Sequence, residues 1–99
     1  MRVRWLRGAL RNLDQEAIHI AQDNPKAAAE LVCRLRDRAL LLGEQPNLGR
    51  PRRIPGTREL VLSNFSYILP YRVRNDTVEI LRVFHTARRW PPKENEPVQ

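Results

Sequence analysis

The stretch YILPYRVRNDTVEILRVFH, residues 67–85, decides the fold of this chain. Aromatic and β-branched side chains are frequent in residues 67–73 and 77–84, and such side chains favour strands. Between the two runs, Arg74-Asn-Asp-Thr77 offers the residues that hairpin turns prefer. Pro70 has no N–H to give to a sheet, so the first strand is expected at an edge or with a bulge. The stretch therefore predicts a β-hairpin.

Working outward, residues 58–62 read as one more strand, and residues 44–56 read as an irregular loop. The loop is rich in proline and glycine, which exclude a long helix or a central strand. It carries three arginines, Arg50, Arg52 and Arg53. The second half of the chain therefore predicts three strands that follow a basic loop.

The N-terminal residues predict a short strand and a first helix. Val3 and Trp5 alternate with arginines over residues 2–5, which is typical of a strand. A helix is expected from about Leu6 or Gly8 to Gln22, because apolar residues recur there at helical spacing. This stripe consists of Leu6, Leu10, Leu13, Ala17 and Ile20.

A second helix is expected from Pro25 to about Leu42. Asn24 is a favourable N-cap, and proline is tolerated in the first turn because its missing N–H would have no partner there. Gly43 is a favourable C-terminal stop. The apolar stripe of this helix consists of Ala28, Leu31, Val32, Leu35, Ala39 and Leu42. Only a few residues join the two helices, so they are expected to form an antiparallel hairpin.

The element order predicts an α+β fold. An N-terminal strand and an antiparallel helical hairpin should be followed by strands, with the hairpin packed on one face of a mostly antiparallel sheet of three to four strands. The chain has 99 residues, which suits one domain. We expect this domain to span residues 1–92, because Trp90-Pro-Pro92 ends the strand pattern, and residues 93–99 to form a polar tail.

Several classes of function are unsupported by the composition. One cysteine, Cys33, and two distant histidines, His19 and His85, give no metal-ligand spacing, and four scattered glycines give no phosphate-binding loop, so no metal and no cofactor is expected. No segment resembles a signal peptide or a membrane span. Cys33 is expected to be a small buried residue, and one free thiol suits a reducing cytoplasm.

Positive charge is concentrated in the second half of the chain. Residues 1–48 hold eight Lys or Arg and six Asp or Glu, whereas residues 49–93 hold ten and three. Nine of those ten basic residues are arginines, whose planar forks suit carboxylates and phosphates. The excess is read either as an ordinary solvated surface or as a surface that faces an acidic partner.

His85 is the one histidine that stands in a suggestive setting. It ends the last predicted strand, with Arg82 before it and Arg88, Arg89 and Trp90 after it. Nearby cations disfavour the protonated form of an imidazole, so His85 is expected to be mostly neutral at pH 7. It is read either as a structural residue at a strand end or as a general base or hydrogen-bonding contact.

Three segments together resemble the RelE/ParE toxin superfamily of type II toxin–antitoxin systems. They are GTRELV at 56–61, YILPYRV at 67–73 and VEILRVFHTARRWP at 78–91. The resemblance covers nearly the whole chain, and the Asn24-Pro25 opening of the second helix agrees with it. It implies a helical hairpin on an antiparallel sheet, in a cytoplasmic bacterial protein of a kind associated with plasmid stabilization.

The resemblance also implies the partners. A cognate antitoxin, ParD-like or RelB-like, would wrap the toxin with an acidic C-terminal segment and form a hetero-oligomer with it. Operator DNA would be bound only through the antitoxin. The target would be DNA gyrase in the ParE branch or ribosome-bound messenger RNA in the RelE branch. A non-toxic binding module that only partners a DNA-binding antitoxin is a third reading.

Ile68 favours the ParE branch, which poisons gyrase and is not a nuclease. Nuclease members resembling this chain commonly carry an arginine at that place, facing the scissile phosphate, and isoleucine stabilises no charge. If the chain were a nuclease after all, the catalytic candidates would be His85, Arg82 and Arg88. The candidates for binding a target or partner are Arg50, Arg52, Arg53, Arg58, Tyr71, Arg72, Arg82, His85, Arg88, Arg89 and Trp90.

Overall fold

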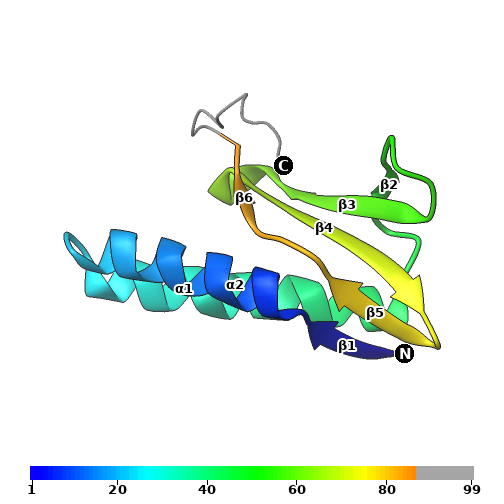
Figure 1. Cartoon of the computed structure of the whole chain (residues 1–99). Helices are drawn as coiled ribbons and strands as arrows, with labels where there is room; N and C mark the ends of the chain where they lie inside the picture. The colour runs from blue at the N-terminus through cyan, green and yellow to red at the C-terminus, as the bar shows by residue number, and fades with distance from the viewer. Residues whose placement is uncertain (87–99) are drawn as a thin grey trace.

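The computed structural model describes residues 1–86. Two helices lie along one face of a sheet, as Figure 1 shows, so the predicted α+β fold is confirmed. The elements are β1 Arg2–Trp5, α1 Arg7–Ala21, α2 Pro25–Glu44, β2 Arg50–Pro51, β3 Thr57–Leu62, β4 Tyr67–Arg74, β5 Thr77–Ile80 and β6 Phe84–His85. A short 3₁₀ turn, Ser63–Phe65, joins β3 to β4. The end of the predicted domain, 87–92, and the predicted tail, 93–99, lie outside the described residues.

The sheet has the strand order β1-β5-β4-β3-β2, and β6 also pairs with β4. Only β1 and β5 run parallel; the other pairs in the described chain are antiparallel. The sequence predicted three to four strands. The structure has more because the loop before β3 contributes the two-residue strand β2, and because the predicted strand 77–84 divides into β5 and β6.

Pro70 explains that division, although it lies in the central strand and not at an edge as one reading of the sequence expected. Its carbonyl accepts a 2.8 Å bond from the Leu81 N–H, so its missing N–H faces the same side. Between the paired positions there, three residues, 81–83, oppose two residues of β4. The expected bulge is therefore present, and the Val83 N–H turns instead to the Asn12 side chain at 3.1 Å.

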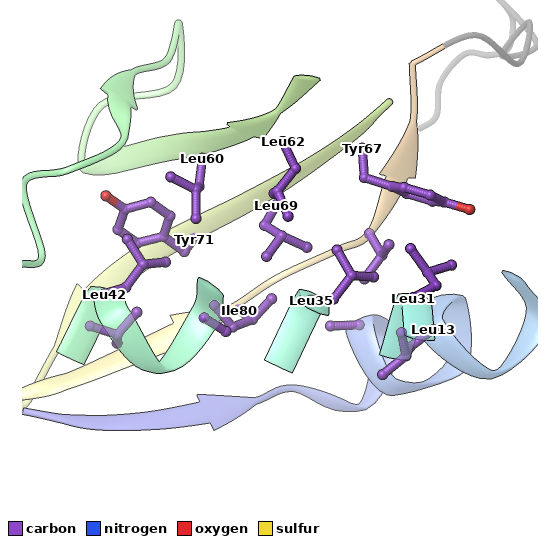
Figure 2. Packing of buried hydrophobic residues seen from close by; sticks show 14 residues of the cluster. Leu13, Leu31, Leu35, Leu42, Leu60, Leu62, Tyr67, Leu69, Tyr71 and Ile80 are labelled. Carbon is purple, nitrogen blue, oxygen red and sulfur yellow. The ribbon is translucent and has the colours of Figure 1, made fainter. Parts of the chain in front are cut away.

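The helical hairpin is held at its turn by Asn24, whose side chain accepts a 3.0 Å bond from the Ala27 N–H, as the capping pattern predicted. The core lies between the hairpin and the sheet, as Figure 2 shows, with leucines from both helices meeting aliphatic and tyrosine side chains from the strands. Leu35, Leu42 and Ile80 are fully buried. Burial of each such side chain contributes about 2 kcal/mol.

Three predicted positions are wrong. Gly43, expected to end the second helix, lies inside α2, which continues to Glu44. Leu10 is 47% exposed, because α1 turns Ala9, Leu13 and Glu16 inward instead. Cys33 is exposed on α2, because Leu31 and Leu35 point inward and a residue two positions after Leu31 points almost the opposite way around a helix. In residues 1–86 no helix combines the length and apolar character needed to cross a bilayer.

Candidate functional site

One face of the sheet is turned away from both helices (Figure 1) and carries several arginines, two of which, Arg50 and Arg72, are predicted binding candidates. Successive side chains of a strand point to opposite faces. Because Leu69, Tyr71, Val78 and Ile80 point into the core, their neighbours in sequence point to this second face, which we call the open face. Its members are Arg2, Arg4, Arg50, Thr57, Glu59, Val61, Ile68, Pro70, Arg72, Arg74, Thr77, Glu79 and Phe84.

One end of the open face is built around Glu79. Its Oε1 lies 2.7 Å from Arg72 Nε and 3.8 Å from Arg74 Nε, and Arg4 is its neighbour on β1. The hydrogen bond from Arg72 lowers the pKa of the Glu79 carboxyl, and the charges of Arg74 and Arg4 lower it further, whereas desolvation opposes them. Glu79 is therefore ionised at neutral pH and fixes the orientation of Arg72. We call Arg2, Arg4, Arg72, Arg74 and Glu79 the basic end.

The arginines of the loop before β3 share a second carboxylate. Arg50 and Arg52 lie 2.6 Å and 3.4 Å from the Glu59 oxygens, so both predicted candidates point toward β3. Arg50 keeps 66% of its side chain exposed, which leaves part of its fork available to a partner. Arg53, also a predicted candidate, is exposed within the loop between β2 and β3.

Tyr71 and Arg58 hold this loop in place from the core side. The Tyr71 hydroxyl accepts a 2.8 Å bond from the Gly49 N–H and donates a 2.7 Å bond to the Pro46 carbonyl. Arg58 donates to the Gly49 carbonyl at 2.7 Å. Burial raises the pKa of Tyr71, which keeps the hydroxyl protonated as this donor, while the Gly49 bond and the Arg58 charge partly offset the rise.

Gly49 is tied to this arrangement by space. A Cβ atom at residue 49 would lie 2.6 Å from Tyr71 Cε1 and 2.7 Å from the Glu59 carbonyl oxygen, so any side chain would force the loop away. Tyr71 itself is 0% exposed. Of the predicted binding candidates, Tyr71 thus contributes by fixing the loop that carries Arg50 and Arg52, and it presents no surface of its own.

The other end of the open face is apolar. Val61 on β3 pairs with Ile68 on β4, and Ile68 pairs with Phe84 on β6, so three apolar side chains lie side by side across the sheet. Val61 is 39% exposed, and the other two are half-buried. We call these three residues the apolar row. Ile68, the central member of the row, stands where a nuclease resembling this chain was expected to carry the phosphate-facing arginine.

His85 lies on the helix side of the sheet and pairs with Tyr67 of β4. Its ring meets the Tyr67 ring edge-on with centroids 4.9 Å apart, and the Tyr67 hydroxyl donates a 2.8 Å bond to Glu16 of α1. No role was predicted for Glu16, although an acidic residue three positions after Leu13 on a core-facing helix was a usable signal. This trio joins α1, β4 and β6.

Arg82 belongs to the bulge and lies close to α1. A Cβ atom at Gly8 would overlap the Arg82 guanidinium, whose NH1 donates a 2.8 Å bond to the Leu81 carbonyl. Arg82 is exposed. The remaining predicted candidates, Arg88, Arg89 and Trp90, lie outside the described residues.

The structure thus places Arg50 and Arg72 on the open face, where Arg52 reaches Glu59 from the loop, and places His85 and Arg58 on the other face. Arg2, Arg4 and Arg74 were not predicted as binding residues, because the distribution of charge along the chain does not show which strands lie side by side. The alternation of arginine with apolar residues in β1 was the available signal. Within residues 1–86 no cluster of His, Cys, Asp or Glu could hold a metal ion.

Known proteins resemble this chain over nearly its full length. Residues 3–90 match the model of the family described as ParE toxin of type II toxin-antitoxin system, parDE. The chain is 49% identical, over 91% of its length and 93% of the relative's, to "Putative toxin Y4kP" of Sinorhizobium fredii (strain NBRC 101917 / NGR234).

Two solved structures of toxin–antitoxin systems are also similar to this chain. A chain of the chromosomal ParDE toxin–antitoxin system of P. aeruginosa has a TM-score of 0.77 and 28% identity, covering 86% of this chain and 95% of that one. A chain of the RelBE2 toxin–antitoxin complex of Mycobacterium tuberculosis has a TM-score of 0.59 and 30% identity, with 85% and 95% covered. The chain therefore belongs to the ParE toxin family of type II toxin–antitoxin systems, within the RelE/ParE superfamily.

Proposed function

We propose that this toxin acts by binding and inhibiting DNA gyrase, and that it is not a nuclease. The apolar row is the observation that supports this most directly. Cleavage of RNA through its 2′-hydroxyl needs cationic donors for the phosphate in the transition state. Val61, Ile68 and Phe84 offer no donor side chain, whereas a protein surface with its own apolar residues would bury them favourably.

The cognate antitoxin is the second partner that we propose. The similar structures from P. aeruginosa and M. tuberculosis are toxin–antitoxin systems. The arginine-rich surface of this chain also suits an acidic segment that folds on binding. We propose a ParD-like antitoxin whose C-terminal segment neutralises the toxin in a hetero-oligomer in the cytoplasm, and which alone binds operator DNA. Added antitoxin should then raise the melting temperature of the toxin, because it binds only the folded form.

Purified components test the gyrase proposal. Toxin freed from antitoxin is expected to inhibit supercoiling of a relaxed plasmid by gyrase, and an excess of antitoxin should restore it. The same toxin should leave ribosome-bound messenger intact in a translation extract. Normal supercoiling at an excess of folded toxin would overturn the proposal.

A ribosome-dependent nuclease is the alternative, and the His85–Tyr67–Glu16 trio is the observation that favours it. A histidine beside a tyrosine that is itself oriented by a carboxylate can exchange protons with a substrate. In this case His85→Ala should abolish messenger cleavage while the melting temperature changes little. Full toxicity of His85→Ala would remove His85 as a base and leave the gyrase proposal as it stands.

A further inference from the structure

The basic end of the open face contains more arginine than its carboxylate can neutralise. Glu79 is already bound by Arg72 and approached by Arg74. Arg2 and Arg4 add two exposed guanidinium groups from β1, in register with Thr77 and Glu79. Within residues 1–86, neither of these two arginines has a carboxylate oxygen within 4.0 Å. Four arginines around one carboxylate leave a local surplus of positive charge.

The surface between these arginines is hollowed. A depression of about 350 Å³ lies between β1 and the turn from β4 to β5, and its lining includes Arg2, Arg4, Arg74 and Glu79. Thr77 and Asn75 add neutral hydrogen-bonding groups, and Val3 is the one apolar residue among the described residues that line it. A protein interface is normally centred on aromatic or aliphatic anchors, whereas contacts to a nucleic-acid backbone are polar and strongly basic. The lining favours phosphates.

The arrangement of the arginines also suits a row of phosphates. Arg2 and Arg4 are two residues apart on one strand, which separates them by about 7 Å, and Arg72 and Arg74 repeat this spacing two strands away, about 10 Å from β1. Both pairs point to the same face. Arginine forks bind phosphate oxygens in pairs, so each of the two rows can follow a sugar–phosphate strand.

We propose that Arg2, Arg4, Arg72 and Arg74 form a binding surface for the phosphate backbone of duplex DNA. The inference rests on the proposed function in one respect: the duplex would be the segment that gyrase holds while the apolar row contacts the enzyme. It is separate from operator binding through the antitoxin. DNA contact would add affinity to the toxin–gyrase complex without requiring a particular base sequence.

Fluorescence anisotropy with a labelled duplex of about 30 base pairs tests the surface directly, at several salt concentrations. Arg2→Gln with Arg4→Gln is expected to weaken binding by about tenfold or more and to reduce the slope of log affinity against log salt by about 1.8. The matched control, Arg36→Gln with Arg38→Gln, removes the same charge from exposed positions on α2 and should change the affinity by less than about twofold. Arg74→Gln alone should reduce the slope by about 0.9.

Two results would overturn the proposal. We call Arg2→Gln with Arg4→Gln the β1 pair and Arg36→Gln with Arg38→Gln the α2 pair. An equal loss of DNA affinity in both would show that the total positive charge, and not this particular surface, determines binding. Arginine-dependent binding of a poly-glutamate peptide, with no effect of the β1 pair on DNA, would assign the surface to an acidic protein. Circular dichroism checks that each variant is folded.

The two proposals fail separately, because the anisotropy measurement contains no gyrase. Absence of gyrase inhibition by the wild-type toxin would overturn the proposed function and leave DNA binding standing. Inhibition that persists, with duplex binding unaffected by the β1 pair, would overturn only the DNA surface.

Discussion

The two ends of the open face differ in chemistry although both use strand β4. At one end Ile68 stands between Val61 and Phe84, and four residues further along the same strand Arg72 stands beside Glu79. The distance between Ile68 and Arg72 along the strand is about 13 Å. The open face thus has one end suited to apolar contact and another end suited to binding anions. The two ends are close enough for a single partner or complex to cover both.

The two ends are also held differently. The residues of the apolar row are cross-strand neighbours on three strands, and the core leucines Leu62 and Leu69 lie next to them in sequence on the other face of the sheet. The basic end depends on ion pairs in which one carboxylate orients two arginines. Apolar contacts are insensitive to pH and salt, whereas ion pairs are weakened by acid and by added salt.

The largest effect is expected for Ile68→Glu. A carboxylate in the middle of the apolar row would be buried without a partner in any protein interface, so gyrase inhibition should fall by about 100-fold or more. The measurement is the toxin concentration that halves supercoiling. Val73→Glu is the control, because it places the same charge on an exposed position of the same strand but on the other face. Equal effects of the two variants on gyrase inhibition would contradict a specific role of the apolar row in binding gyrase.

Tyr71→Phe should have the next largest effect, on stability. Removing the hydroxyl leaves the buried Gly49 N–H without its acceptor, which costs about 2 kcal/mol and lowers the melting temperature by about 10 °C. Thr57→Val is the matched control, because it removes an exposed hydrogen bond to Ile54 and should cost less than about 0.5 kcal/mol. A melting temperature of Tyr71→Phe within 2 °C of the wild type, taking about 1 kcal/mol as several degrees, would contradict the role of the hydroxyl.

The fold was largely predictable from the sequence, and the two ends of the open face were not. Alternation and turn residues place the hairpin at residues 67–85, and the Asn24-Pro25 cap places the second helix, because these signals are local. Arg4 lies beside Glu79 only because β1 and β5 pair in parallel, and the two residues are 75 positions apart in sequence. The Ile68–Phe84 contact depends on the bulge opposite Pro70, which shifts the register of the last strand. Strand pairings between distant residues have no signal in the local sequence.

The sequence reading of α1 failed for a related reason. Leu10 and Glu16 exchange their expected environments, since an apolar residue lies outward and an acidic residue lies inward beneath Tyr67. Helical periodicity specifies a stripe, but its exact centre is set by what the helix packs against. The Tyr67 hydroxyl stabilises the buried carboxylate through a contact 51 positions away in sequence.

A smaller effect is expected for Glu79→Gln, and it depends on pH. The pKa of Glu79 in the folded protein lies below its ordinary value of 4.5, so its ionised form stabilises the fold above that value and this contribution is lost as the pH falls through the folded pKa. Urea unfolding should find the variant less stable than the wild type at neutral pH, with the difference closing in strong acid. A difference that stays constant across this range would contradict the ion pairs with Arg72 and Arg74.

The smallest effect is expected for Cys33→Ser, which probes a surface that belongs to neither end. Cys33 is exposed on α2, on the helix side of the sheet, so the substitution should change the free energy of unfolding by less than about 0.5 kcal/mol. The wild-type thiol should react with a maleimide reagent in the folded toxin, and a fluorophore there should leave gyrase inhibition and duplex binding unchanged. If the label abolished inhibition while duplex binding persisted, the outer face of α2 would join the apolar row as part of the gyrase contact.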